Sequence, residues 1–280
     1  MSVRQHCQVR HNRPTKIIVI AVLVASTTAL VLRSWLQVVL RDHDLDKLFA
    51  ADLSYLISFP ILLLLLFPVW RTSCTWIRPC LDVTVLDMRF VVRALALGIL
   101  LRAAWWCQLV SGISLGLYGN SDPALVSGPV FRFQCPDGQV IIIGFVVMAI
   151  LVPLIEEVVH RGFVQSALNR YGSGIAIVGS AAIFTVFHPP ANWGFVFFAG
   201  LVFGTQFRIT KSLWSSLLTH ATINGIIQID WRCLQGQWNP HPSDIPVVES
   251  AVPALVLLLA CVTSIGIILA GMHRGDDSPR

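Results

Sequence analysis

Two adjacent glutamates at the end of an apolar run are the residues best placed to do chemistry in this sequence. Glutamate occurs only three times in the 280 residues, and two of these are Glu156 and Glu157. An ionised side chain at membrane depth is costly unless it is paired or hydrated, so a functional site is the default hypothesis. Arg161 follows Glu157 by four residues and can hold a carboxylate charged and oriented. An ion cluster at the membrane boundary, without chemistry, is the alternative for this segment alone.

Three further polar side chains are expected at a similar depth. If the helix that begins at Val140 turns back at Gly172, Glu157 lies 15 residues before the turn and His188 lies 16 residues after it. An antiparallel hairpin would bring both to nearly the same level. Prolines follow His188, so a helix end is expected there. His220 and Asn224 are four residues apart and share one face of another helix. Carboxylates, imidazoles and an amide from three helices should therefore meet.

The same residues match, in order, the three motifs of the CPBP family of intramembrane proteases. The motifs Glu-Glu-x-x-x-Arg, Phe-x-x-x-His and His-x-x-x-Asn correspond here to Glu156, Glu157 and Arg161, to Phe184 and His188, and to His220 and Asn224. The family includes the type II CAAX prenyl endopeptidases and bacteriocin-processing relatives. The resemblance covers roughly Val140 to Ile229, while the first three spans carry little of the family signature.

The resemblance implies an all-helical membrane fold of about eight spans, with a water-filled cavity open toward the cytosol. It implies that Glu156 activates water together with His188, and that His220 and Asn224 stabilise the oxyanion. Amide hydrolysis needs such a base and such donors. Spacing alone does not say which glutamate is the base. Glu157 pairs more naturally with Arg161, which leaves Glu156 free, and the resemblance points the same way.

Other functions also fit these residues. A carboxylate and two imidazoles can hold a catalytic zinc ion, although the HExxH arrangement is absent; we expect no cofactor, with zinc as the alternative. A transporter or channel could use the intramembrane Glu, His and Arg as a proton pathway, although no repeat symmetry relates the two halves of the chain. A catalytically silent scaffold that binds a partner helix is a third possibility.

Two other ionisable residues need a separate interpretation. His160 is expected to face a different side of the helix from Glu156, so it is left outside the site. Arg102 lies about 18 Å into its span and is a second intramembrane charge. It could contact substrate, although snorkelling or structural pairing explains it equally well.

Composition identifies the environment. Apolar residues make up 55% of the chain and charged residues 12%, against about 25% charged residues in soluble domains. Segments of roughly 20 apolar residues can cross a bilayer. The sequence therefore predicts an all-α, polytopic membrane protein that forms one domain over 1–280, with a catalytic core at 140–229. The expected spans are Ile17–Leu40, Leu53–Trp70, Phe90–Leu117, Val140–Ile155 continuing toward Arg170, Ile175–His188, Trp193–Phe207, Leu213–Ile229 and Val252–Met272.

Lysine and arginine are concentrated before Ile17 and between spans two and three, which predicts cytoplasmic termini. The first span is interpreted as a retained anchor, since its apolar run exceeds a signal-peptide core. The expected location is a prokaryotic inner membrane. The expected partners are lipid and a protein or peptide substrate, not nucleic acid. Prenylated CAAX tails, bacteriocin precursors and exported proteins with sorting signals all fit as substrates. A disulfide between Cys135 and Cys233 would require an oxidising exterior.

Overall fold

The computed structural model describes residues 15–43, 45, 47–116, 138–228 and 251–276, and every regular element within them is helical. The predicted all-α membrane fold is therefore confirmed. The α-helices are α1 Thr15–Asp42, α2 Lys47–Ile77, α3 Met88–Ser114, α5 Gly138–Gly144, α6 Val152–Glu157, α7 Ser166–Leu168, α8 Ser173–Val186, α9 Trp193–Thr210, α10 Leu213–Gln228 and α12 Val252–Asp276.

The segment that carries the two glutamates is one continuous helix from Gly138 to Leu168, which we call the central helix. Two stretches of it, Phe145–Leu151 and Val158–Gln165, are wound more loosely as π-helix and flank the six-residue α6. Such π-segments are rare and occur often at functional sites. Here they bracket the two glutamates, and Arg161 lies within the second of them.

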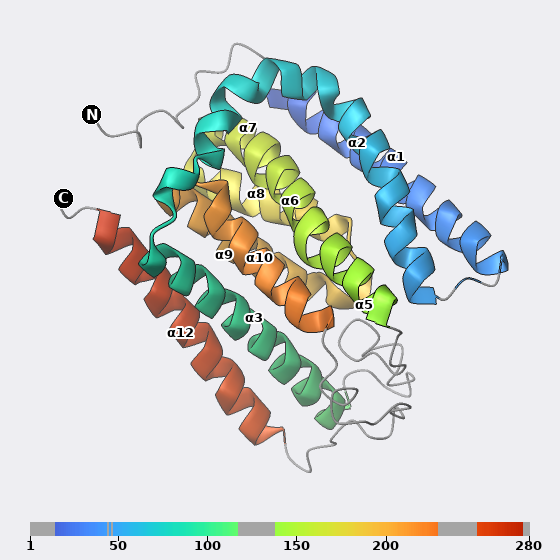
Figure 1. Cartoon of the computed structure of the whole chain (residues 1–280). Helices are drawn as coiled ribbons and strands as arrows, with labels where there is room; N and C mark the ends of the chain where they lie inside the picture. Colours follow the sequence, from blue (N-terminus) through green and yellow to red (C-terminus); the bar gives the residue numbers. More distant parts are fainter. Residues whose placement is uncertain (1–14, 44, 46, 117–137, 229–250, 277–280) are drawn as a thin grey trace.

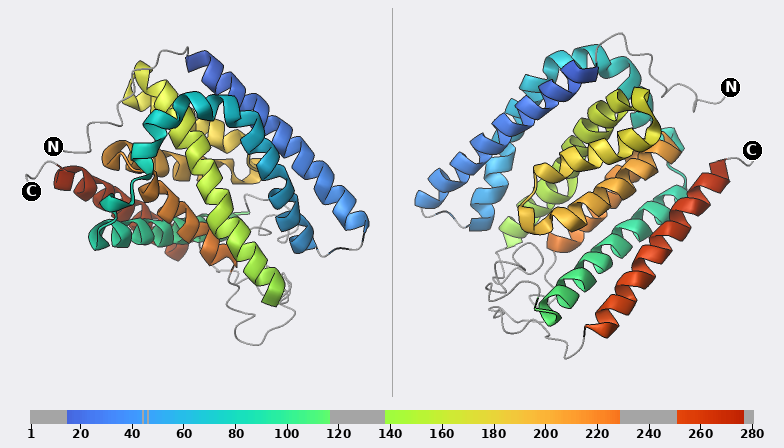
Figure 2. Two further views of the ribbon diagram at one scale, coloured as in Figure 1. Left: turned by 45° about the horizontal axis from the view of Figure 1, so that its top comes forward. Right: turned by 180° about the vertical axis from the view of Figure 1, so that it is seen from behind.

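The helices form a bundle with an outer pair at each edge (Figure 1). α1 and α2 pack against each other at one edge, and α3 and α12 at the other. The central helix, α8, α9 and α10 lie between these pairs, as the two further views also show (Figure 2). α1 begins and α12 ends on the same side of the bundle, as an even number of crossings requires. The polar motif residues thus lie in the middle of the molecule.

Within the described ranges, five segments are long and apolar enough to cross a membrane: Thr15–Asp42, Phe49–Arg71, Met88–Gly112, Val140–Tyr171 and Val252–His273. The remaining predicted spans correspond to α8, α9 and α10, which have 14, 18 and 16 residues. At about 1.5 Å per residue, all three are shorter than a hydrocarbon core of about 30 Å, α9 only slightly. α8 is nevertheless apolar, and Ile175, Val178 and Val186 form an exposed apolar face on it. That each of the three helices crosses the membrane stays a prediction.

The turn between the central helix and α8 is where the sequence predicts it. The central helix continues through a short 3-10 turn to Tyr171, and Gly172 follows with φ of +107°, a conformation that glycine adopts without penalty. α8 begins at Ser173 and runs back along the central helix. At the same end, the Thr15 hydroxyl donates to the Ala167 carbonyl over 3.0 Å. This bond fixes the start of α1 beside the end of the central helix.

Candidate active site

A buried ion cluster joins the central helix to α10. Oε1 of Glu157 lies 3.2 Å from Nη1 of Arg161, one helical turn further on, and 3.0 Å from Nδ1 of His220. Glu157 and Arg161 are fully buried. A buried charge persists only when it is paired and hydrogen-bonded. The pairing of Glu157 with Arg161 that the spacing predicts is therefore present, and His220 completes it.

Glu156 occupies a different environment from its neighbour. Its side chain is 21% exposed, against 1% for Glu157. Its nearest ionisable partner is Nε2 of His220, 3.7 Å from Oε2, which is longer than a hydrogen bond. No hydrogen-bond partner is recorded for Oε2. Oε2 of Glu157 likewise has no hydrogen-bond partner, so the two carboxylates differ in the partial exposure of Glu156 and in the close contacts of Glu157 Oε1.

Arg161 and Gln165 attach the central helix to α9. Nη2 of Arg161 donates to the Gly200 carbonyl over 3.2 Å, and Nε2 of Gln165 donates to the Gly204 carbonyl over 2.8 Å. Both pairs are one turn apart on their helices, so the two bonds are parallel. A Cβ at Gly200 would lie 3.1 Å from the Ala181 Cα. Glycine there allows the close approach of α8 to α9, and the Arg161 guanidinium is held rigidly.

His188 lies just beyond the end of α8, as the prolines after it predict. Its Nδ1 is 2.9 Å from the Phe184 carbonyl, and its own carbonyl accepts the indole N–H of Trp193 at 2.8 Å. A carbonyl is only an acceptor, so Nδ1 carries the proton and Nε2 is the free acceptor in a neutral ring. His188 interacts electrostatically with Glu156 and His220. His188 therefore lies near both of them.

Aromatic rings pack against the imidazoles and the guanidinium of the cluster. The Phe184 ring contacts His188, His220 and His160 at centroid distances of 4.6, 5.8 and 5.1 Å, and the Arg161 guanidinium lies 4.7 Å from its centre. Phe203 stacks on His220 at 5.0 Å. The phenylalanine of the second motif is therefore the common neighbour of all the imidazoles at the site, and the rings restrict their orientation.

Asn224 lies one turn after His220 on α10, and its amide Nδ2 donates to the Met148 carbonyl over 2.9 Å. Met148 belongs to the first π-segment of the central helix. Because an amide nitrogen carries two hydrogens, one donor remains for another acceptor. The structure therefore brings the first and third motifs together across the interface between the central helix and α10.

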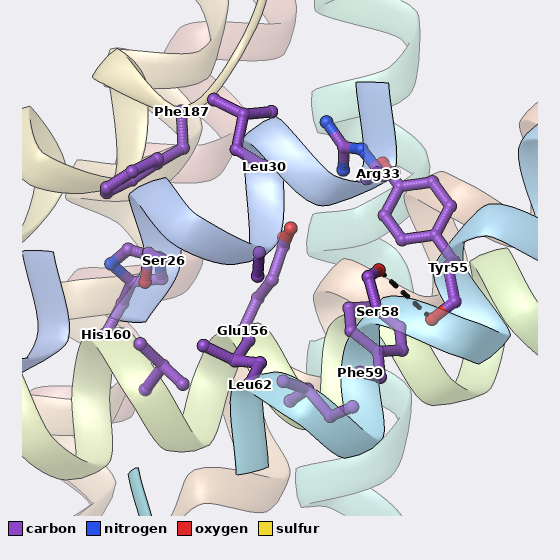
Figure 3. A pocket seen from close by; sticks show the side chains of 13 residues that line it. Ser26, Leu30, Arg33, Tyr55, Ser58, Phe59, Leu62, Glu156, His160 and Phe187 are labelled. Carbon is purple, nitrogen blue, oxygen red and sulfur yellow. Dashed lines mark hydrogen bonds between the residues drawn. The ribbon is translucent and has the colours of Figure 1, made fainter. Parts of the chain in front are cut away.

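A cavity extends from Glu156 toward α1 and α2 (Figure 3). The part of it that water can enter has a volume of about 60 Å³. The residues around it come from four elements and are mostly apolar. They are Ser26, Ala29, Leu30, Arg33, Tyr55, Ser58, Phe59, Leu62, Ile155, Glu156, Val159, His160 and Phe187.

Two features of this cavity differ from the sequence-based picture. The prediction that His160 faces away from Glu156 is wrong: the two are four residues apart, share a helical face and line the same cavity. Arg33 and Tyr55 were not predicted at the site at all. They lie on the first two helices, where no motif exists, and a charge inside an apolar span was the only available signal.

Arg102 lies elsewhere. Its guanidinium is 4.9 Å from the centre of the Trp105 ring, and that ring stacks on Phe195 at 5.2 Å. It does not line the cavity that contains Glu156. Cys135 and Cys233 lie outside the described residues. Within the described ranges, no three His, Cys, Asp or Glu side chains are grouped closely enough to hold a metal ion.

Comparison with known proteins places this geometry in a family context. Residues 138–226 match the family model described as type II CAAX prenyl endopeptidase Rce1-like. No curated protein and no solved structure matches the chain. The matched segment contains every motif residue and begins at the first residue of the central helix, so the resemblance to the CPBP intramembrane proteases is confirmed over this segment. The family match indicates a protease and supports CAAX-type intramembrane endopeptidase activity.

Proposed function

We propose that this integral membrane protein, whose residues 138–226 match the type II CAAX prenyl endopeptidases, hydrolyses a peptide bond with water that Glu156 activates. The observation that carries the proposal is the unequal environment of the two glutamates. Glu157 is committed to Arg161 and His220 through Oε1, whereas Glu156 is partly exposed, lines the cavity and lies 3.7 Å from its nearest ionisable partner. A general base needs an accessible acceptor beside the substrate.

His188 is the second group that acts on the water. With its Nδ1 proton engaged by the Phe184 carbonyl, Nε2 accepts a hydrogen bond from the nucleophile and fixes its direction. Glu156 takes one proton from the water as the oxygen attacks the scissile carbonyl carbon. When the carbon–nitrogen bond breaks, the same proton is returned to the leaving amine.

His220 and Asn224 supply donors for the oxyanion. Glu157 is an acceptor, so the His220 Nδ1 carries a proton. The oxyanion role requires a second proton, on Nε2, which faces Glu156, where charge develops on the carbonyl oxygen. Asn224 offers its second amide hydrogen. Donors held in place before the reaction, as the Glu157 and Met148 contacts hold these, lower the barrier without reorganisation.

The proposal extends to substrate and location. The substrate is a membrane-associated peptide, with a prenylated C-terminal CAAX tail as the first candidate because of the family match. The apolar cavity lining suits an aliphatic tail. The protein lies in a prokaryotic inner membrane with both termini cytoplasmic, and the mechanism needs no metal.

The test uses the full chain in lipid nanodiscs with a peptide that ends in a prenylated cysteine followed by three residues. Mass spectrometry should detect release of the C-terminal fragment by wild type and none by Glu156→Gln. Asp82→Asn, an exposed carboxylate in the connection before α3, serves as the matched control and should cleave like wild type. Cleavage by Glu156→Gln at the wild-type rate would exclude Glu156 as the base.

A further inference from the structure

The cavity contains one permanent cation as well as the carboxylate of Glu156. That cation is Arg33, which lies in the second half of α1 and outside the segment that matches the family. A charged side chain within an apolar span is costly, and its presence calls for a partner or a function. Figure 3 shows Arg33 beside Tyr55, on the cavity wall that α1 and α2 form.

This guanidinium lies outside the ion cluster of the active site. Its recorded neighbour is Tyr55, whose ring centre lies 4.4 Å from the guanidinium carbon. None of the ion pairs described above, all within the Glu156–Glu157–His220–Arg161 cluster, includes Arg33. An aromatic face offers only partial compensation for a cation within an apolar span. The planar fork of an arginine is suited to bind a carboxylate bidentately.

The hydrogen bond between Thr15 on α1 and Ala167 on the central helix allows the distance from Glu156 to Arg33 along the bundle to be estimated. Arg33 lies roughly 27 Å along α1 from Thr15, and Glu156 lies roughly 16 Å along the central helix from Ala167. Because Thr15 and Ala167 are hydrogen-bonded, Arg33 is on the order of 10 Å further along the bundle. An extended chain covers that distance in about three residues.

We propose that Arg33 is a substrate-binding residue that pairs with the C-terminal carboxylate of the peptide, about three residues beyond the scissile bond. This inference rests on the proposed function, since it takes Glu156 as the position of the scissile bond. The apolar lining between Glu156 and Arg33, which includes Leu30, Phe59 and Leu62, contacts the intervening apolar side chains. The carboxylate then meets Arg33, the one permanent cation among the described residues of the cavity wall. An acidic side chain has the same chemistry, so the experiment separates the two sources.

The experiment measures kcat and KM for four prenylated peptides of one sequence, with the full chain in nanodiscs. The first has a free C-terminus, the second a C-terminal amide, and the third an amide with aspartate as the last residue. The fourth is the first peptide lengthened by three residues at its C-terminus. Wild type should cleave the free acid with a kcat/KM about tenfold to a hundredfold above the amide, as expected for a hydrogen-bonded charge. The extended peptide should behave like the amide.

In Arg33→Gln this preference should disappear through a raised KM for the free acid, while the amide is cleaved as by wild type. Arg33→Lys keeps the charge without the fork and should retain part of the preference. Arg102→Gln removes an intramembrane arginine outside the cavity and should leave the preference unchanged. A merely structural role of Arg33 would lower the rates for both peptides equally.

Several outcomes would overturn the inference. An unchanged free-acid preference in Arg33→Gln would do so, as would equal rates of wild type on acid and amide, a result that does not depend on the variant folding. Full recovery by the aspartate side chain would overturn the assignment to the terminal carboxylate. In each case the proposed function still stands if wild type cleaves the peptides and Glu156→Gln does not. No cleavage of any peptide by wild type would instead count against the proposed function.

Discussion

Glu157 accepts a hydrogen bond from Nδ1 of His220 at 3.0 Å, across the interface between the central helix and α10. The same carboxylate oxygen also holds Arg161. Both contacts are buried, so the pair contributes to the stability of the bundle and sets the orientation of the imidazole. Glu156, next in the chain, takes no part in this packing. The two glutamates should therefore respond differently to substitution.

Removal of the Glu157 carboxylate should destabilise the protein. In Glu157→Ala the Arg161 guanidinium loses its acidic partner in a fully buried site, which costs about 3–5 kcal/mol. Glu156→Ala should change the free energy of unfolding far less, because that side chain is partly exposed and its ion pair with His220 is longer, at 3.7 Å. Unfolding of each variant in mixed detergent micelles checks the difference. Equal losses for both would contradict the division of roles.

Asn224 should matter for catalysis more than for binding. Asn224→Ala removes a donor that we assign to the oxyanion, and one such donor is worth about 10²–10³ in kcat. KM should change little. Thr222→Ala, on the same helix, removes a hydroxyl that bonds only its own helix at Leu218 and should keep most of the activity. Steady-state kinetics on the prenylated peptide compares them, and a loss confined to KM would exclude the oxyanion role.

Chelation should leave the activity unchanged, because a carboxylate base and a histidine acceptor can activate water without a Lewis acid. The test treats the purified protein exhaustively with chelator, assays cleavage and measures bound metal by elemental analysis. Wild-type activity with less than stoichiometric metal is the expected result. A stoichiometric zinc whose removal abolishes cleavage and whose return restores it would overturn the metal-free mechanism.

A close approach between α3 and α10 depends on a glycine. A Cβ at Gly98 would lie 2.5 Å from the Thr222 Cβ and 2.8 Å from the Thr219 carbonyl oxygen, so a helix must move. Gly98→Ala should lower the free energy of unfolding by about 1–3 kcal/mol, the usual cost of overpacking. Gly266→Ala on α12 is the matched control, since nothing lies within 4 Å of its added methyl. Equal stability of both variants would show that α10 shifts freely.

More of the catalytic site than of the cavity wall can be predicted from the sequence. Local spacing was enough to predict that Glu157 pairs with Arg161, that Gly172 turns the chain and that His188 follows a helix end, because each depends on neighbouring residues. The four-residue spacing of His160 from Glu156 also places both on one helical face, so the prediction that they face apart goes against a local pattern. Arg33 and Tyr55 meet Glu156 only through the packing of distant helices, which no local pattern encodes. The π-segments, which shift the register along the central helix, also lack a sequence signal.

The connection between α9 and α10 offers a test that is independent of catalysis. Lys211 adopts a left-handed conformation with φ of 55° at the end of α9, a position where glycine is usual. Burial, with a smaller effect of nearby Arg208, lowers the pKa of Lys211 to about 8 from its usual 10.5. Lys211→Gly should therefore stabilise the protein by about 1 kcal/mol. Thermal unfolding in detergent measures this gain.

The pH dependence of that gain has a definite sign. Between pH 8 and 10.5 the unfolded chain binds a proton at Lys211 that the folded chain has lost, so the free energy of unfolding of wild type should rise with pH across this window. The rise should be small, since the side chain is only half buried and solvent screens it. Lys211→Gly lacks the group, so its advantage over wild type should shrink from pH 8 to 10.5. An advantage that grows with pH would mean that the folded protein favours the charged lysine, contrary to the burial that we describe.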